Sequence, residues 1–171
     1  MKLRSHHFGT IALLALFCCG SGTAQTSFMV RIRDLQFSKH VCTVVNTNGT
    51  LRREVTSIEM GGITTPQVFA GTASEDDIKR LKELVLAPDF QAAARRNERE
   101  FMIQGQGQII SVETTVADSL QTVVFADTKG QTSAPSYLAG FLSFADEVRH
   151  RKLSKVKGRV EPMCRPPRTG Q

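Results

Sequence analysis

Hydrophobic and polar residues alternate with a period of two over residues 27–34, where Phe28, Val30 and Ile32 fall on one face. Arginines occupy two positions of the opposite face. This alternation predicts a strand that is buried on one side only. A second short run, residues 67–71, is rich in strand-forming residues and predicts a further strand.

Two pairs of β-rich runs predict two hairpins. Residues 41–46 and 50–56 flank Asn48-Gly49, and Asn-Gly between such runs is a strong hairpin signal because both residues tolerate positive φ. Residues 108–116 and 120–126 form the second pair and are rich in β-branched side chains. We therefore expect most of the sheet to be antiparallel.

An amphipathic helix is predicted to begin after Ser74 and to end at Pro88. Ser74 can accept hydrogen bonds from free backbone N–H groups, and the acidic run Glu75-Asp76-Asp77 complements the positive end of the helix dipole. Apolar residues then recur at helical spacing, at Ile78, Leu81, Leu84 and Val85. The same spacing predicts an ion pair between Asp76 and Arg80 on the outer face.

A second main helix is predicted over residues 136–152. Its apolar stripe consists of Tyr137, Leu138, Phe141, Leu142, Ala145 and Val148. Residues 89–98 suggest a short helical turn with Phe90 pointing inward, and residues 99–103 are a further candidate strand. Together these elements predict an α+β fold, with an antiparallel sheet of five or six strands and two main helices packed on one face.

The first 24 residues have the three-part pattern of a secretory signal peptide. Lys2 and Arg4 supply a positive start, residues 8–19 are apolar, and small residues lead to a cleavage site after Ala24. The apolar run is about 12 residues long, which is too short for a membrane span of about 20. We therefore expect an exported protein, either periplasmic or secreted.

The cysteines bear on how the signal peptide is processed and on whether a disulfide forms. Acylation of Cys18 or Cys19, as in a lipoprotein, is the alternative to plain cleavage, but bulky residues precede both positions where small ones are needed. Removal of the signal peptide leaves Cys42 and Cys164. Two cysteines in an oxidising compartment allow a single pairing, so we expect a disulfide between a strand and the C-terminal segment.

Charge is divided unevenly along the chain. Residues 25–148 carry twelve Lys/Arg against fifteen Asp/Glu, whereas residues 149–171 carry eight Lys/Arg against one Glu. We expect residues 25–153 to form one domain and residues 154–171 to form a basic, largely extended tail pinned at Cys164. The candidate residues for binding an anionic partner are Arg149, Arg151, Lys152, Lys155, Lys157 and Arg159.

Catalytic signatures are sparse in this sequence. Beyond the signal peptide the histidines are His40, expected in a loop, and His150, expected on the polar side of the last helical turn. We expect both on the surface, since neither belongs to a recognisable nucleophile motif. His, Cys and carboxylate residues also do not occur at metal-ligand spacing. The sequence therefore predicts no catalytic residue, no metal and no cofactor.

The pattern resembles small exported bacterial α+β domains with no assigned function. The resemblance rests on Cys42 and Val44 in a strand, the Asn48-Gly49-Thr50-Leu51 turn, the Ala73–Asp77 segment before a helix, and Phe90 after it, and it extends to the late hairpin and the terminal helix. It spans most of residues 27–150 and implies the fold alone.

The leading functional hypothesis is a non-enzymatic binding or interaction module of the cell envelope or the secreted space. The partner would be an anionic surface or an acidic protein, bound through the basic tail. Sequence-specific nucleic-acid binding is not expected, because no aromatic residues are interleaved with the basic ones. The alternative is a hydrolase with a polar pocket near His40 or residues 99–107, or a hydrolase inhibitor. An inhibitor would use a protruding loop at residues 61–66 or 129–135.

Overall fold

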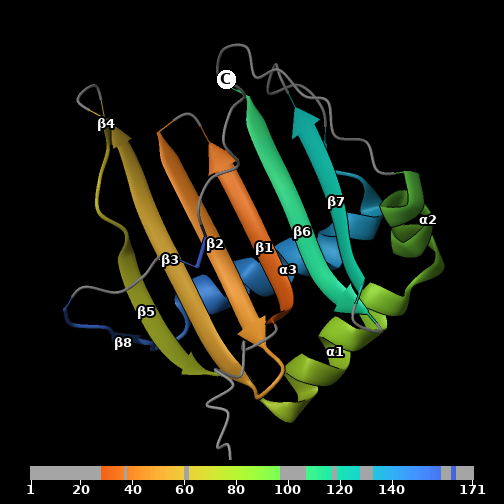
Figure 1. Cartoon of the computed structure of the whole chain (residues 1–171), viewed down its shortest axis with the longest axis horizontal. Coiled ribbons are helices and arrows are strands. Elements are labelled where there is room, and N and C mark those ends of the chain that lie inside the picture. Colours follow the sequence, from red (N-terminus) through yellow and green to blue (C-terminus); the bar gives the residue numbers. More distant parts are fainter. Residues whose placement is uncertain are drawn as a thin grey trace, which may run out of the picture.

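A largely antiparallel sheet carries three helices on one face (Figure 1). The computed structural model describes residues 28–36, 38–59, 62–96, 107–116, 119–127, 133–158 and 163–164, with the side chains of Phe28 and Val116 excepted. The strands are β1 (Phe28–Gln36), β2 (Lys39–Asn46), β3 (Thr50–Glu59), β4 (Gly62–Ile63), β5 (Gln67–Thr72), β6 (Gln108–Val116), β7 (Ser119–Asp127) and β8 (Ser154–Lys155). The helices are α1 (Glu75–Leu86), α2 (Pro88–Arg96) and α3 (Ser136–His150).

The strands follow the order β7-β6-β1-β2-β3-β5-β8, and β4 pairs with β3 outside this path. The predicted α+β class is confirmed, but the described residues contain eight strands and three helices rather than five or six strands and two main helices. Strands β4 and β8 have two residues each, too few to show any periodicity in the sequence. The expected turn after Pro88 is a nine-residue helix, because proline at a first helical position starts a helix as readily as it ends the one before.

The β2–β3 hairpin forms at the predicted Asn-Gly turn. Gly49 has a φ of 80°, a backbone conformation that residues other than glycine rarely adopt. Its N–H donates to the Asn46 carbonyl at 3.0 Å. The Asn48 Oδ1 atom accepts the N–H of Thr50 at 3.0 Å. The turn therefore supplies its own hydrogen bonds.

Helix α1 begins with a complete capping box. The Ser74 Oγ accepts the N–H of Asp77 at 3.1 Å, and the Asp77 carboxylate accepts the N–H of Ser74 at 2.8 Å. The prediction that Arg80 pairs with Asp76 was wrong. Arg80 Nη1 instead donates to both carboxylate oxygens of Glu147 on α3, at 2.7 and 2.9 Å.

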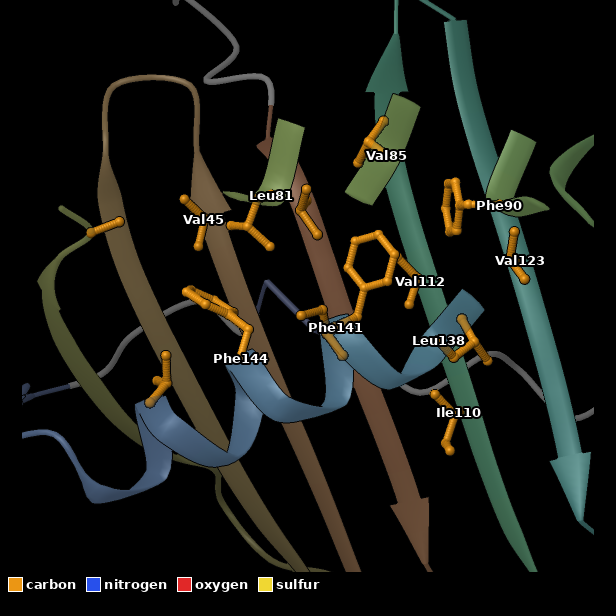
Figure 2. Close-up of a cluster of buried hydrophobic side chains, with 14 of the residues drawn as sticks. Val45, Leu81, Val85, Phe90, Ile110, Val112, Val123, Leu138, Phe141 and Phe144 are labelled. Carbon is orange, nitrogen blue, oxygen red and sulfur yellow. The ribbon is translucent and has the colours of Figure 1, made fainter. Parts of the chain in front are cut away.

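The hydrophobic core lies between the sheet and the helices. Figure 2 shows Phe141 and Phe144 of α3 pointing toward the strands, with Phe90 of α2 next to Phe141. The rings of Phe90 and Phe141 are 5.0 Å apart between centroids, a favourable separation for an aromatic pair. Phe90 is fully buried, as the sequence predicted. This core fixes the last turn of α3 against the sheet.

Within the described part of the chain, no helix is long and apolar enough to cross a membrane. The expected signal peptide, residues 1–24, and the candidate strand at residues 99–103 lie outside the described residues.

Candidate functional site

Two groups of polar side chains stand out, and they lie on opposite faces of the sheet. The face opposite the helices, called here the outer face, carries three arginines and two glutamates around a small apolar centre. Cross-strand pairing places them in two rows. One row is Glu113, Arg31, Val44 and Arg52; the other is Ser111, Arg33, Cys42 and Glu54.

The carboxylate of Glu113 binds both arginines of β1. Arg31 Nη1 lies 2.7 Å from one oxygen, and Arg33 Nη2 lies 2.6 Å from the other. The three side chains are only 12–17% exposed. Burial is the main cause that lowers the pKa of Arg33, and the Glu113 carboxylate opposes it. This cluster is internally paired and largely covered.

The carboxylate of Glu54 holds the C-terminal segment on the outer face. It accepts the backbone N–H of Met163 at 2.9 Å and that of Cys164 at 3.3 Å, and Arg52 Nη2 lies 2.7 Å away. The Glu54 side chain is 3% exposed. Its buried charge is therefore compensated by one cation and two N–H donors, as a buried carboxylate requires.

Cys42 and Cys164 lie at disulfide-bonding distance, with Cα atoms 6.1 Å apart. Both are buried together with Val44, and Met163 packs against the three. This pairing joins β2 to a segment 122 residues later in the chain, which is the link that the two remaining cysteines predicted.

The expected exposure of His40 was wrong. His40 lies in β2 and is only 5% exposed, because the strand begins at Lys39 and places the ring opposite Leu35 and Thr56. Burial, followed by the charge of Arg33, lowers the pKa of His40. His150 is on the surface as expected, with Nδ1 2.9 Å from the Asp146 carbonyl oxygen.

Arg151, one of the six candidate residues of the basic tail, is engaged inside the fold. Its guanidinium donates to both carboxylate oxygens of Asp77, at 2.6 and 2.8 Å, and lies 5.5 Å from the ring centre of Phe144. These hydrogen bonds hold the pKa of Asp77 well below its usual range. Arg151 therefore ties the end of α3 to the beginning of α1.

Four of the other candidates are exposed near the end of α3 and along β8, namely Arg149, Lys152, Lys155 and Lys157. A fifth cation, Arg53 of β3, was not among the predicted candidates, and cross-strand register places it in one row with Lys155. Arg53 lies opposite Phe69 of β5, and Phe69 lies opposite Lys155 of β8, so all three side chains are on the helix side of the sheet. We call Arg53, Arg149, Lys152, Lys155 and Lys157 the basic edge.

Within the described residues, the cations of the basic edge lack the short, buried carboxylate pairs found on the outer face. Arg53 is half-buried, with Cζ 5.9 Å from the ring centre of Phe69. Within the described residues its buried Nε–H has no partner, which is also true of the Nε–H of Arg33 on the outer face. Burial, followed by the charge of Arg149, lowers the pKa of Arg53. Arg149 has one distant carboxylate, Asp146 at 4.0 Å, and both side chains are more than 60% exposed. Such a pair contributes little in water.

A signal for Arg53 does exist in the sequence. Residues 51, 53 and 55 of β3 share one face, and Leu51 and Val55 are apolar, so Arg53 is a cation on an otherwise apolar face. Arg159 lies outside the described residues, as do most of residues 99–107 and 129–132. Residues 62 and 63 form β4 and pair with β3, so this part of one predicted inhibitor loop belongs to the sheet.

A metal-ligand cluster and a surface hollow are two other kinds of site to compare with these polar groups. In the described ranges, no three His, Cys, Asp or Glu side chains gather as metal ligands would. A shallow hollow on the outside of α1 is lined by Glu75, Ile78, Lys79, Lys82, Glu83 and Leu86, all from a single helix. It contains no histidine and lies on a different element from His40. The basic edge is therefore the best candidate site, and its chemistry is that of anion binding.

Comparison with known proteins assigns no family to this arrangement. No protein-family model matches the chain, and no significant match is found among curated proteins or solved structures.

Proposed function

We propose that this chain is an exported, non-enzymatic binding module that recognises a polyanionic partner through the basic edge. One contrast carries the proposal. On the outer face, Glu113 and Glu54 pair with arginines and the side chains are largely covered. On the basic edge, the lysines are exposed and have no carboxylate partner within the described residues. Cations that are not used by the fold are available to an outside anion.

The chemistry of the edge favours a surface of repeated negative charges. Lys155 and Lys157 follow one another along an extended segment that joins the sheet through Ser154 and Lys155. Alternate residues of such a segment are about 6.6 Å apart, so successive ammonium groups can meet successive anionic groups. The proposed partner is thus a polymer or surface that displays sulfate, phosphate or carboxylate groups.

The fold holds this edge in place from two sides. Strand β8 pairs with β5, and the N–H of Val156 donates to the Val68 carbonyl at 2.9 Å. On the other side, Arg151 is bound by Asp77 and fixes the chain where it leaves α3. The cations are therefore presented from an ordered frame, which lowers the entropic cost of binding.

Retention on immobilised heparin and on anionic phospholipid vesicles tests the proposal at low salt. A triple variant, Lys152→Gln, Lys155→Gln and Lys157→Gln, removes three charges of the edge without removing the segment that carries Cys164. Its matched control is Lys79→Gln, Lys82→Gln and Arg95→Gln, which removes three exposed charges from α1 and α2.

The proposal predicts that the edge variant loses retention and that the control keeps most of it. Equal retention of both variants would mean that binding depends on net charge alone, and it would exclude the basic edge as the binding site. Retention on heparin but not on vesicles would identify a soluble or wall-like polyanion as the partner. The reverse would identify a lipid surface.

A further inference from the structure

We infer that the basic edge contains one discrete subsite for a tetrahedral oxyanion, a phosphate or sulfate group, formed by Arg53, Arg149 and Lys155 beside the ring of Phe69. This inference rests on the proposed function, since the subsite is the part of the edge to which three elements each contribute a cation. Each of the three comes from a different part of the chain: β3, α3 and β8.

The sheet supplies the floor of the subsite. Arg53, Phe69 and Lys155 form one cross-strand row, with the aromatic ring between the two cations. Neighbouring strands are about 4.8 Å apart, so the two cationic residues start about 10 Å from each other on either side of the ring. The Arg53 guanidinium lies over the ring, at 5.9 Å from its centre, which restricts the positions that the side chain can take.

Helix α3 supplies the third cation. Figure 1 shows α3 crossing the sheet and ending at the side where β5 and β8 lie. Arg149 is in the last turn of this helix, and its charge acts on Arg53. The only carboxylate paired with Arg149 in the described residues is the exposed Asp146 at 4.0 Å, so a bound anion would offset the repulsion between the two guanidinium groups.

The arrangement of donors favours a tetrahedral anion over a carboxylate. A planar carboxylate is satisfied by one guanidinium through two parallel hydrogen bonds. Here two guanidinium groups and one ammonium group are contributed by three different elements. A phosphate or sulfate offers enough acceptor oxygens to take a hydrogen bond from each of them at once.

The test is titration of the full-length oxidised protein with inorganic phosphate, sulfate and acetate, followed by NMR of backbone amides and of arginine Nε–H groups. The inference predicts saturable shifts at Arg53, Phe69 and Lys155 with phosphate and sulfate, and none with acetate at equal ionic strength. Arg53→Gln and Arg149→Gln should each weaken phosphate binding at least tenfold. Lys157→Gln, which lies outside the subsite, should change it less than twofold.

Arg53→Lys controls for a folding defect in Arg53→Gln, since it keeps the positive charge but lacks the planar guanidinium group. It should retain the fold and bind phosphate less tightly than the wild type. Shifts that do not saturate, or that acetate reproduces, would overturn the subsite. If heparin retention still depends on the lysines of the edge, the proposed function survives that result; if retention fails as well, both are wrong.

Competition distinguishes two sources of the anion. Vesicles that contain phosphatidic acid should displace inorganic phosphate from Arg53 if the ligand is a lipid headgroup, whereas neutral vesicles should not. Displacement by sulfated oligosaccharide alone would assign the subsite to a sulfated polymer.

Discussion

Asp77 at the start of α1 accepts two hydrogen bonds from Arg151, the residue that follows α3, at 2.6 and 2.8 Å. The same carboxylate also accepts the N–H of Ser74 and so completes the capping box of α1. One buried side chain therefore links the beginning of one helix to the end of another, 74 residues apart in sequence. It also fixes the point from which the basic edge leaves the helix layer.

Replacing Asp77 should destabilise the fold. Asp77→Ala removes the cap and leaves the Arg151 guanidinium without its main partner, which should lower the free energy of unfolding by about 2–4 kcal/mol. Asp76→Ala, in the same helical turn but exposed, should change it by about 0.5 kcal/mol or less. Urea denaturation of both variants measures the difference. Equal losses would mean that the link to Arg151 contributes nothing beyond the helix dipole.

The low pKa of Asp77 gives its contribution a definite dependence on pH. Because folding lowers this pKa, the stabilisation is complete above the unfolded value, about 3.9, and is lost as the pH falls through and below it. Asp77→Asn should therefore show a smaller loss of stability than the wild type between about pH 5 and pH 2. Parallel curves for the two proteins over that range would contradict the assignment.

His40 should make the stability of the fold depend on pH in a second range, above that of Asp77. Burial and Arg33 lower its pKa, while Glu54 and Asp34 on neighbouring strands oppose the shift. The folded state then binds fewer protons than the unfolded state below about pH 6.5, so stability should fall as the pH drops from that value toward the folded pKa. His40→Gln should flatten the wild-type curve between about pH 6.5 and pH 5. An unchanged slope in the variant would show that His40 titrates normally.

The disulfide should be a major source of stability. Cys164→Ser opens a loop of more than 120 residues and should lower the free energy of unfolding by about 2–5 kcal/mol. It should also speed hydrogen exchange at the Met163 and Cys164 amides, which donate to Glu54. Mass spectrometry of the wild type, purified without reductant, should show that Cys42 and Cys164 have together lost two hydrogens. Two free thiols in that sample would exclude the bridge.

The sequence predicted those features that depend on local chemistry. The Asn48-Gly49 turn, the Ser74 cap and the burial of Phe90 all follow from residues within one or two turns of each other. The pairing of Cys42 with Cys164 is long-range, but it was predictable because these are the two cysteines that lie beyond the expected signal peptide.

The features that the sequence did not reveal depend on tertiary contacts. Arg80 could have paired with Asp76 along α1, but α3 brings Glu147 within reach. His40 is buried only because strands pack on both of its sides. Arg53 joins the tail cations through cross-strand register, which periodicity within a single strand does not give.

The salt dependence of heparin binding separates binding at the basic edge from a general effect of net charge. Each cation that contacts a polyanion contributes to the slope of log K against log salt concentration. We expect the variant with Lys152, Lys155 and Lys157 all changed to Gln to have a slope smaller by about two to three than that of the wild type. The control with Lys79, Lys82 and Arg95 changed to Gln should keep the wild-type slope. A control that loses as much slope as the edge variant would contradict the assignment of binding to the basic edge.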